Sequence, residues 1–361
     1  MAPNKALIFA KHPETFPVPG EHLIVKTTDF DLDASPPAGG LILKTNHISY
    51  DPYLRGKMKP PNPGSYTPGF EIGKPIYNNA ISTVVASDNP RFKKGDVVIG
   101  YSNFEEYVKV PKERADKDQM AYSVGLSLLE NSLGLDPKIF LGALGMSGLT
   151  AYSSLYEIGH PKKGQTIFVS AASGAVGQIV GQLAKREGLK VLGSVGSAEK
   201  LEFVTKRLGF DGGFNYKTEK PEDALKRLLK EVGSESIDIY YDNVGGEQLD
   251  ASISLMTVFG RIVCCGSVSQ TSKTQGERNL ISNIGLVVGK RLTIRGFLVT
   301  DKDFASKYWE EHQTNVQKWI KEGNLTVKSS VTEGIDNGAE GFLGMLKGEN
   351  FGKAILTIAE L

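Results

Sequence analysis

The sequence predicts an α/β fold in which a β-rich first domain is followed by a doubly wound parallel sheet. Short apolar runs broken by Pro and Gly fill residues 1–128, whereas strand-like and helix-like segments alternate regularly through residues 129–308. The 361 residues also suit two domains of about 100–200 residues each. We therefore place one domain at 1–128, completed by the tail 309–361, and the other at 129–308.

In the first domain, apolar runs at residues 22–28, 39–49, 81–87 and 95–101 predict strands. The stretch PPNPGSYTPG, residues 60–69, predicts a turn between them.

The second domain opens with a strand, a glycine turn and a helix. TIFVSA, residues 166–171, is rich in β-branched and aromatic residues, and IVGQLAKR, residues 179–186, carries apolar residues at helical spacing. Between them Ala172, Gly174 and Gly177 form an A-x-G-x-x-G pattern. Such a turn directs unpaired helix N–H groups at whatever lies above it, which suits a pyrophosphate. A tight turn that binds no ligand is the alternative.

Strand and helix continue to alternate beyond this turn. We expect strands at 190–196, 212–216, 237–244, 260–266 and 291–299, with helices at 198–209, from Pro221, from Gln248 and after residue 266. In the tail we expect an amphipathic helix near 303–322 and a strand at 353–358, both packed back on the first domain.

Composition excludes several kinds of partner. The 42 basic and 41 acidic residues give a net charge of +1 with no long single-sign block, which does not suggest a nucleic-acid partner. We see no apolar segment of signal-peptide or membrane-spanning length. The two cysteines, Cys264 and Cys265, are adjacent in an apolar run and read as small core residues in a reducing compartment. We expect a soluble, cytoplasmic protein.

The tip of the second strand indicates which nucleotide binds. An NAD site needs an acid about 20 residues past the glycines, but Gly196 and Ser197 stand here and Lys200 follows one helical turn later. A small tip with a lysine leaves room for a 2′-phosphate and supplies a charge, so we predict NADPH. Lys200 as an ordinary solvated lysine is the alternative. The fourth and fifth strands end in Asn243 and in Gly266 and Ser267, where ribose and nicotinamide would lie, although Asn243 suits a helix cap equally well.

The chemistry is expected to be metal-free. His12, His22 and His47 lie in the first domain without a ligand-like partner at useful spacing, and neither cysteine is there. Hydride transfer without a metal still needs a donor for the charge that develops on the acceptor oxygen. Tyr50, Tyr53 and Tyr66 are the candidates, each of which could instead be a packed aromatic side chain.

Taken together, these stretches resemble a known family. ISYDPYLRGKM, RFKKGDVVIG, GALGMSGLTAY, AASGAVGQIVGQLAK, DNVGGE, GRIVCCGSVSQ and GENFGKAIL are similar, in order, to motifs of the zinc-independent medium-chain dehydrogenase/reductases of the leukotriene B4 12-hydroxydehydrogenase, prostaglandin reductase and alkenal double-bond reductase type. The resemblance implies a GroES-like first domain, a Rossmann domain and a homodimer. It also implies NADPH-dependent reduction of the C=C bond of enals and enones.

The resemblance also assigns residues. Lys200 and Tyr216 would lie at the 2′-phosphate, and Tyr53 would line the substrate pocket. At the pyrophosphate the resemblance implies Ala172, Gly174, Ala175 and Val176. Along the ribose, nicotinamide and phosphates it implies Met146, Thr150, Asn243, Phe297 and Asn350.

The chain departs from the family pattern near the substrate. Thr271 stands where the family often has a tyrosine near the substrate carbonyl, YNNA replaces a Gly-rich run at 77–80, and Phe104 replaces a tryptophan. Thr271 thus joins the tyrosines as a candidate donor. Three alternative functions remain at this point: a quinone oxidoreductase, a hydroxyl dehydrogenase, and a non-catalytic NADPH-binding protein.

Overall fold

The computed structural model describes residues 1–60, 68–118 and 125–361, which form two compact units. The first unit comprises Met1–Gly142 and Ser329–Leu361, and the second comprises Ala143–Lys328. These divisions lie further along the chain than the residues 128 and 309 at which the sequence pattern changes. The short helix η1 (Pro137–Leu141) explains the first difference, because it packs on strands β3 and β4 of the first unit.

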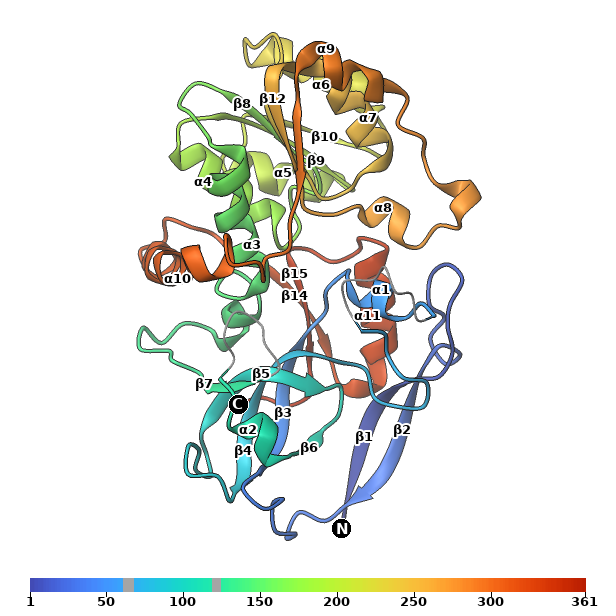
Figure 1. The fold of residues 1–361 in the computed structure, drawn as a ribbon, viewed down its shortest axis with the longest axis vertical. Helices are drawn as coiled ribbons and strands as arrows, with labels where there is room; N and C mark the ends of the chain where they lie inside the picture. The colour runs from blue at the N-terminus through green and yellow to red at the C-terminus, as the bar shows by residue number, and fades with distance from the viewer. Residues whose placement is uncertain (61–67, 119–124) are drawn as a thin grey trace. The chain divides into compact units, whose positions relative to one another are not determined.

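The first unit is built on β-strands (Figure 1). Strands β1 and β2 pair antiparallel, and a seven-stranded sheet runs in the order β14-β15-β3-β4-β5-β7, with β6 paired to β3. The strands are β1 Ala2–Phe9, β2 Leu23–Phe30, β3 Leu41–Ser49, β4 Tyr77–Ser87, β5 Val97–Asn103, β6 Tyr107–Val110, β7 Leu126–Leu128, β14 Ser329–Glu333 and β15 Lys353–Thr357. The helices are α1 Leu54–Lys57, α2 Lys112–Ala115, η1, η6 Ile335–Asn337 and α11 Gly338–Leu346.

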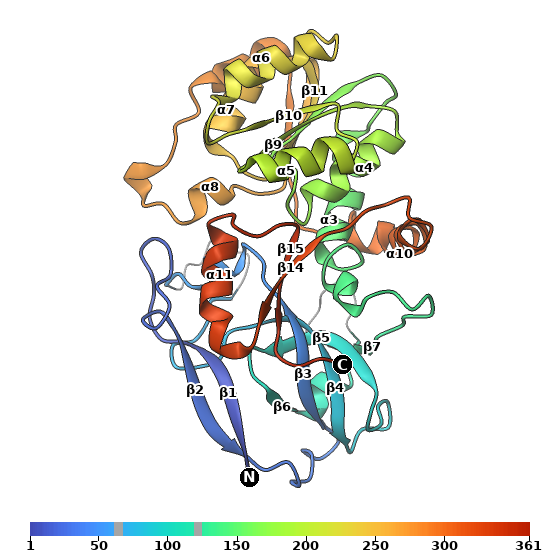
Figure 2. The same cartoon turned by 180° about the vertical axis from the view of Figure 1, so that it is seen from behind.

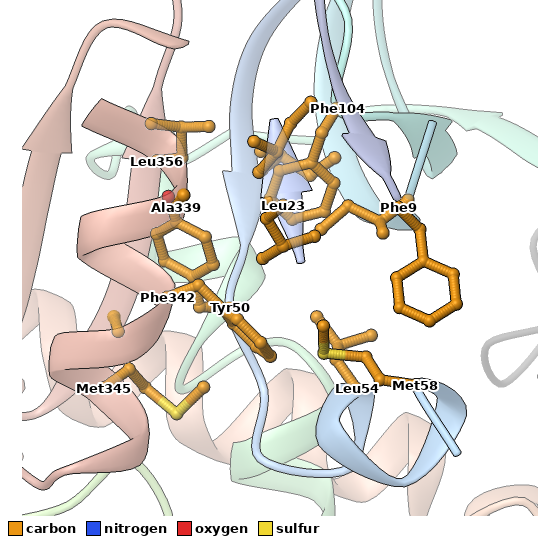
Figure 3. Close-up of a cluster of buried hydrophobic side chains, with 14 of the residues drawn as sticks. Phe9, Leu23, Tyr50, Leu54, Met58, Phe104, Ala339, Phe342, Met345 and Leu356 are labelled. Carbon is orange, nitrogen blue, oxygen red and sulfur yellow. The ribbon is translucent and has the colours of Figure 1, made fainter. Parts of the chain in front are cut away.

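A hydrophobic core joins the C-terminal tail to the start of the chain. Phe342 and Ala339 of α11 belong to one apolar cluster with Tyr50, with Leu54 of α1 and with side chains of the N-terminal strands (Figure 3). Strand β15 also pairs antiparallel with β3. Residues 329–361 therefore complete the first unit through both a sheet and a core.

The second unit contains the predicted doubly wound sheet, seen from opposite sides in Figure 1 and Figure 2. Its six parallel strands run in the order β10-β9-β8-β11-β12-β13. The strands are β8 Thr166–Val169, β9 Lys190–Val195, β10 Gly212–Asn215, β11 Ile237–Asp242, β12 Met256–Cys264 and β13 Thr293–Gly296. The helices are α3 Met146–Ser154, η2 Leu155–Gly159, α4 Gly177–Arg186, α5 Ala198–Glu202, η3 Phe203–Arg207, α6 Pro221–Glu231, α7 Gly246–Leu255, α8 Val268–Thr271, η4 Gln275–Glu277, η5 Ser282–Gly285, α9 Leu286–Lys290 and α10 Ala305–Lys321.

Helix α4 packs as its sequence pattern predicts. Ile179, Val180 and Leu183 are fully buried, and the helix lies against β8 and β9. The chain leaves β8 toward β9 and β10, then returns to β11 on the other side, so the strand order reverses between β8 and β11. Ligands of such sheets bind beyond the carboxyl ends of the strands at this switch point.

The tail helix forms as predicted, but the domain on which it was predicted to pack was wrong. Helix α10 belongs to the second unit and packs on α3. Asn315 donates to the Tyr152 hydroxyl at 2.9 Å, and the imidazole Nε2 of the buried His312 lies 2.9 Å from Ala143 O. Burial lowers the pKa of His312 to about 4, so this side chain is a neutral packing residue. These polar partners lie on α3 and just before it, at Tyr152 and Ala143, and no spacing in the tail sequence reveals them.

Within residues 1–60, 68–118 and 125–361, no helix combines the length and the apolar character that crossing a bilayer requires.

Candidate functional site

The turn between β8 and α4 brings backbone segments unusually close together. Ala171 has a φ of 48°, and the amide of Ala172 donates to Ser194 O on β9 at 2.9 Å. A Cβ on Gly177 would lie 2.4 Å from Ala171 O, so only glycine lets the helix start this close to the turn. The Gly174 amide donates to the same carbonyl at 2.9 Å.

The start of α4 is open to an anion. Val176 at the N-cap makes no side-chain capping bond, and the first turn contains no acidic residue. Ala175, beside it, is only half-buried. The Gln178 and Ile179 amides donate to Gly174 O and Val176 O, so the positive end of the helix dipole is what the start of α4 offers a phosphate.

The tip of β9 is small, free of carboxylates and lined by an aromatic ring. A Cβ on Gly196 would lie 3.0 Å from the Tyr216 hydroxyl, so glycine lets this ring rest against the strand end. Ser197 caps α5 by accepting from the Lys200 amide at 3.2 Å. Lys200 is only 8% exposed, unlike the neighbouring Glu199, which points to solvent. Lys200 is thus not the solvated lysine that the sequence left open.

The ends of β11 and β8 are tied together by Asn243. Its amide side chain donates to Ser170 O at 2.8 Å, and its backbone N–H donates to Ser170 Oγ at 2.9 Å. The cap of α7 is Gly245, so Asn243 does not cap that helix. Gly266 follows β12 directly beneath Asn243 O, which a Cβ on Gly266 would approach to 3.2 Å. Glycine at 266 therefore leaves room for the Asn243 carbonyl beside the end of β12.

A cavity of about 470 Å³ lies beyond the ends of β11 and β12, lined among others by Asp242, Gly245, Cys264, Cys265 and Ser267. Burial raises the pKa of Cys264 to about 11 and that of Cys265 to about 12. Both are free thiols, and both are half-buried rather than the fully packed core residues that we expected. Burial also raises the pKa of Asp242, while N–H groups of Gly245 and Val244 donate to its carboxylate.

Four further predicted residues lie elsewhere in the second unit. Met146 begins α3, and the carbonyl of Thr150 on that helix accepts from Ser154 Oγ at 2.8 Å. The Phe297 ring follows β13 and packs on Phe304, with centroids 4.8 Å apart. Thr271 ends α8, where its hydroxyl donates to Ser267 O at 3.2 Å. Thr271 therefore lies next to a predicted cofactor residue.

In the first unit, Tyr50 lies in the core. Its side chain is 1% exposed, and its ring packs between Phe104 and Phe342 (Figure 3). Its hydroxyl donates to Gly338 O at 2.7 Å, and burial raises its pKa well above the usual range. Tyr50 thus has the packed environment that we gave as its alternative.

Tyr53 packs against the hydrophobic core of the first unit, but its hydroxyl has polar partners. It precedes α1 as its N-cap residue, and its hydroxyl donates to Asn78 Oδ1 at 2.5 Å. Tyr101 on β5 also forms a side-chain hydrogen bond with Tyr53. Sequence reasoning missed Asn78 and Tyr101, although Asn78 belongs to the 77–80 run that departs from the family pattern. Asn350 donates to Gly352 O at 2.7 Å, and Tyr66 falls outside the described residues.

The first-domain histidines each have a partner in the protein. His12 Nδ1 lies 2.8 Å from Met58 O, His22 Nδ1 accepts from the Val18 amide at 3.0 Å, and His47 Nδ1 lies 3.0 Å from Thr357 Oγ1. Among the residues that the structure describes, no three His, Cys, Asp or Glu side chains gather as a metal site would require. The described chain thus offers side chains for a nucleotide and none grouped for a metal.

Known proteins resemble the chain along its whole length. Residues 5–117 match the family described as "N-terminal domain of oxidoreductase", and residues 175–314 match "Zinc-binding dehydrogenase". The NADP-dependent oxidoreductase RED1 of Cochliobolus heterostrophus is 48% identical, covering 100% of this chain and 99% of the relative. The NADP(+)-dependent 2-alkenal reductase of Nicotiana tabacum is 36% identical, covering 99% and 98%. Among solved structures, CurA of Vibrio vulnificus in complex with NADPH superposes with a TM-score of 0.85 at 29% identity, covering 99% of this chain and 100% of CurA.

Proposed function

The chain belongs to the zinc-independent medium-chain dehydrogenase/reductases of the alkenal reductase type, and from this premise we propose that it reduces the C=C bond of α,β-unsaturated aldehydes or ketones with NADPH. It is an NADP-dependent oxidoreductase, as its 48% identical relative is. The observation that carries the cofactor choice is the tip of β9, which is small and acid-free, with the largely buried Lys200 one turn beyond it.

The described residues fit NADPH in two places. The open start of α4 beside Gly174 and Val176 suits the pyrophosphate, because no side chain or carboxylate occupies it. The Tyr216 ring rests against Gly196 at the tip of β9, and we assign the adenosine 2′-phosphate to the acid-free region beside this tip, next to Lys200. We assign Asn243, Gly266 and Ser267 to the nicotinamide side, since they follow β11 and β12, which lie across the switch point from β9.

Bound NADPH supplies the hydride that reaches the β-carbon of the substrate. The protein must then stabilise the negative charge that develops on the carbonyl oxygen and admit a proton at the α-carbon. In this proposal Tyr53 or Thr271 supplies the hydroxyl. Tyr50 is the weaker candidate, because its side chain is 1% exposed inside the core, where a substrate cannot reach its hydroxyl.

The direct test is the loss of reduced-nicotinamide absorbance with NADPH or NADH and four substrates: a 2-alkenal, a cyclic enone, a cinnamyl-type enone and a naphthoquinone. We expect NADPH oxidation with the alkenal or an enone and much slower oxidation with NADH. Activity confined to the naphthoquinone would favour a quinone oxidoreductase. No oxidation of NADPH by any of the four, with NADPH binding retained, would favour the non-catalytic reading.

The cofactor assignment has its own control. Lys200→Ala should raise the KM for NADPH by about 10–100-fold and leave the KM for NADH unchanged, because one charge-assisted contact to the 2′-phosphate is lost. Lys206→Ala serves as the matched variant, since Lys206 lies on the adjoining η3, is exposed and pairs only with Glu202 in the structure described. An equal loss for both nucleotides would count against the assignment.

We also propose that the active species is a homodimer in the cytoplasm. The edge strand β13 and its surroundings expose large apolar side chains, namely Val258, Phe259, Leu280, Ile284, Val288, Ile294 and Leu298. An exposed apolar edge of this kind favours pairing with a second chain. The two free thiols suit a reducing compartment. Sedimentation of the wild type and of Ile294→Lys would test the dimer, with a monomer expected only for the variant.

A further inference from the structure

A buried row of hydrogen-bonded side chains ends at the hydroxyl of Tyr53. Lys353 on β15 is 2% exposed, and its Nζ lies 2.6 Å from Asp51 Oδ1. The other carboxylate oxygen of Asp51 accepts from Asn78 Nδ2 at 2.9 Å and from the hydroxyl of Ser49. Asn78 is fully buried, and its Oδ1 accepts the Tyr53 hydroxyl.

The surroundings of Asn78 allow only one orientation of its amide. Nδ2 donates both to Asp51 Oδ2 and to Ser49 O, at 2.9 and 2.8 Å. Both partners are acceptors only, so a flipped amide would set its oxygen against two other oxygens. Oδ1 is therefore held toward Tyr53 by contacts that Tyr53 does not make.

The row also has one direction. The Tyr53 hydroxyl donates its single proton to Asn78 Oδ1, and the Asn78 amide donates in turn to Asp51 Oδ2. Both of these donors point toward the carboxylate of Asp51, whose charge Lys353 balances. Hydrogen bonds aligned in this way strengthen one another.

We propose that Asn78, fixed by Asp51 and Lys353, is a positioning residue that holds the Tyr53 side chain in the substrate pocket by accepting its hydroxyl proton until a substrate oxygen accepts it instead. This inference rests on the proposed function, in which Tyr53 lines that pocket. Asn78 then acts on the reaction only through Tyr53, and the ion pair acts only through Asn78.

A double-mutant cycle tests this dependence. We expect Tyr53→Phe and Asn78→Ala each to lower kcat/KM for an enone about tenfold, the strength of one well-placed hydrogen bond. The double variant should also be about tenfold down, whereas independent effects would multiply to about 100-fold. Ser49→Ala is the matched control, because it removes a bond to the same Asp51 oxygen without touching Tyr53, and it should stay near wild type.

A purely structural role of Asn78 would give multiplied losses in the double variant, and that result would overturn the inference. Where Asn78→Ala does not fold, Asn78→Asp replaces it at equal size. Its carboxyl must carry a proton to donate to Asp51, so its kcat/KM should recover as pH falls, and this recovery should vanish in the Tyr53→Phe background.

A different result separates this inference from the proposed function. A wild type that reduces none of the enals or enones refutes the proposed function. The double-mutant cycle of Tyr53 and Asn78 is then carried out with the free energy of unfolding in urea as the measured quantity. The positioning contact predicts that the stability losses of Tyr53→Phe and Asn78→Ala are not additive, and strictly additive losses would overturn it.

Discussion

Lys57 gives the sharpest stability prediction. Its side chain is 4% exposed at the end of α1, with its ammonium 3.7 Å from the centre of the Tyr77 ring and 4.9 Å from that of Phe70. Burial lowers its pKa from 10.5 to about 8 and is the only cause of the shift. This lowering of the Lys57 pKa corresponds to about 3 kcal/mol by which the charged lysine destabilises the folded state. We therefore expect Lys57→Met to stabilise the first unit at pH 7.

The size of the gain follows from two opposing terms. Removing the buried charge gains up to about 3 kcal/mol, whereas losing the contact with the rings costs about 0.5–2 kcal/mol. The net gain of about 1–2 kcal/mol should raise the melting temperature by a few degrees, since 1 kcal/mol corresponds to about 2–4 °C in a domain of this size.

The pH dependence has a defined sign. The folded pKa lies below the unfolded one, so below about pH 8 both states bind the proton and the whole destabilisation is present. As pH rises from about 8 toward 10.5 the folded state releases the proton first, and the wild type regains stability.

Calorimetry of the wild type and Lys57→Met at pH 7 and pH 10 should therefore show a difference that shrinks at the higher pH. Lys26→Met, at an exposed lysine of β2, should show no such change. A variant less stable than wild type at pH 7, or a gap independent of pH, would refute the reasoning.

Three further predictions concern the second unit. Gly177→Ala should weaken NADPH binding at least about tenfold in a fluorescence titration, because the added Cβ would lie 2.4 Å from Ala171 O. The control variant Gly276→Ala, where a Cβ would meet open space, should bind NADPH normally. An unchanged affinity in Gly177→Ala would show that the turn is not part of the site. Thr271→Tyr should raise kcat for a 2-alkenal by about tenfold, since a phenol is the stronger donor; an unchanged kcat would exclude position 271 from the carbonyl contact. Cys264 and Cys265, with pKa values of about 11 and 12, should react with iodoacetamide at pH 8 more than about 100-fold slower than a free thiol, and mass spectrometry showing fast labelling of the native protein would contradict their burial.

The second unit was predictable because its signals are local. The strand, the glycine turn and the apolar face of α4 all lie within residues 166–186, and each follows from spacing alone. The missing acid at the tip of β9 is likewise a single-position signal. The tail helix α10 forms where it was predicted, but its packing was not predictable, because His312 on α10 meets Tyr152 across 160 residues of chain, which periodicity does not report.

The surroundings of the candidate tyrosines were not predictable. Tyr50 and Tyr53 share one motif, yet the first is buried against Phe342 and the second ends a polar row. Asn78 lies 25 residues from Tyr53, and Lys353 lies 302 residues from Asp51. Only the pairing of β15 with β3 brings that lysine to the carboxylate, and a single sequence carries no trace of it.

The thiols connect the fold to the proposed chemistry. A C=C bond conjugated to a carbonyl accepts a thiolate at the same β-carbon that accepts hydride, and only the thiolate is nucleophilic enough to add. Cys264 and Cys265 line the cavity at the strand ends assigned to the nicotinamide side, where a thiolate would be alkylated by the substrate. Burial keeps both thiols protonated, so two cysteines whose thiolates would react with the substrate can remain at this site. If the wild type loses activity during turnover of a 2-alkenal while the Cys264→Ser variant stays active, burial does not protect the thiol from the substrate.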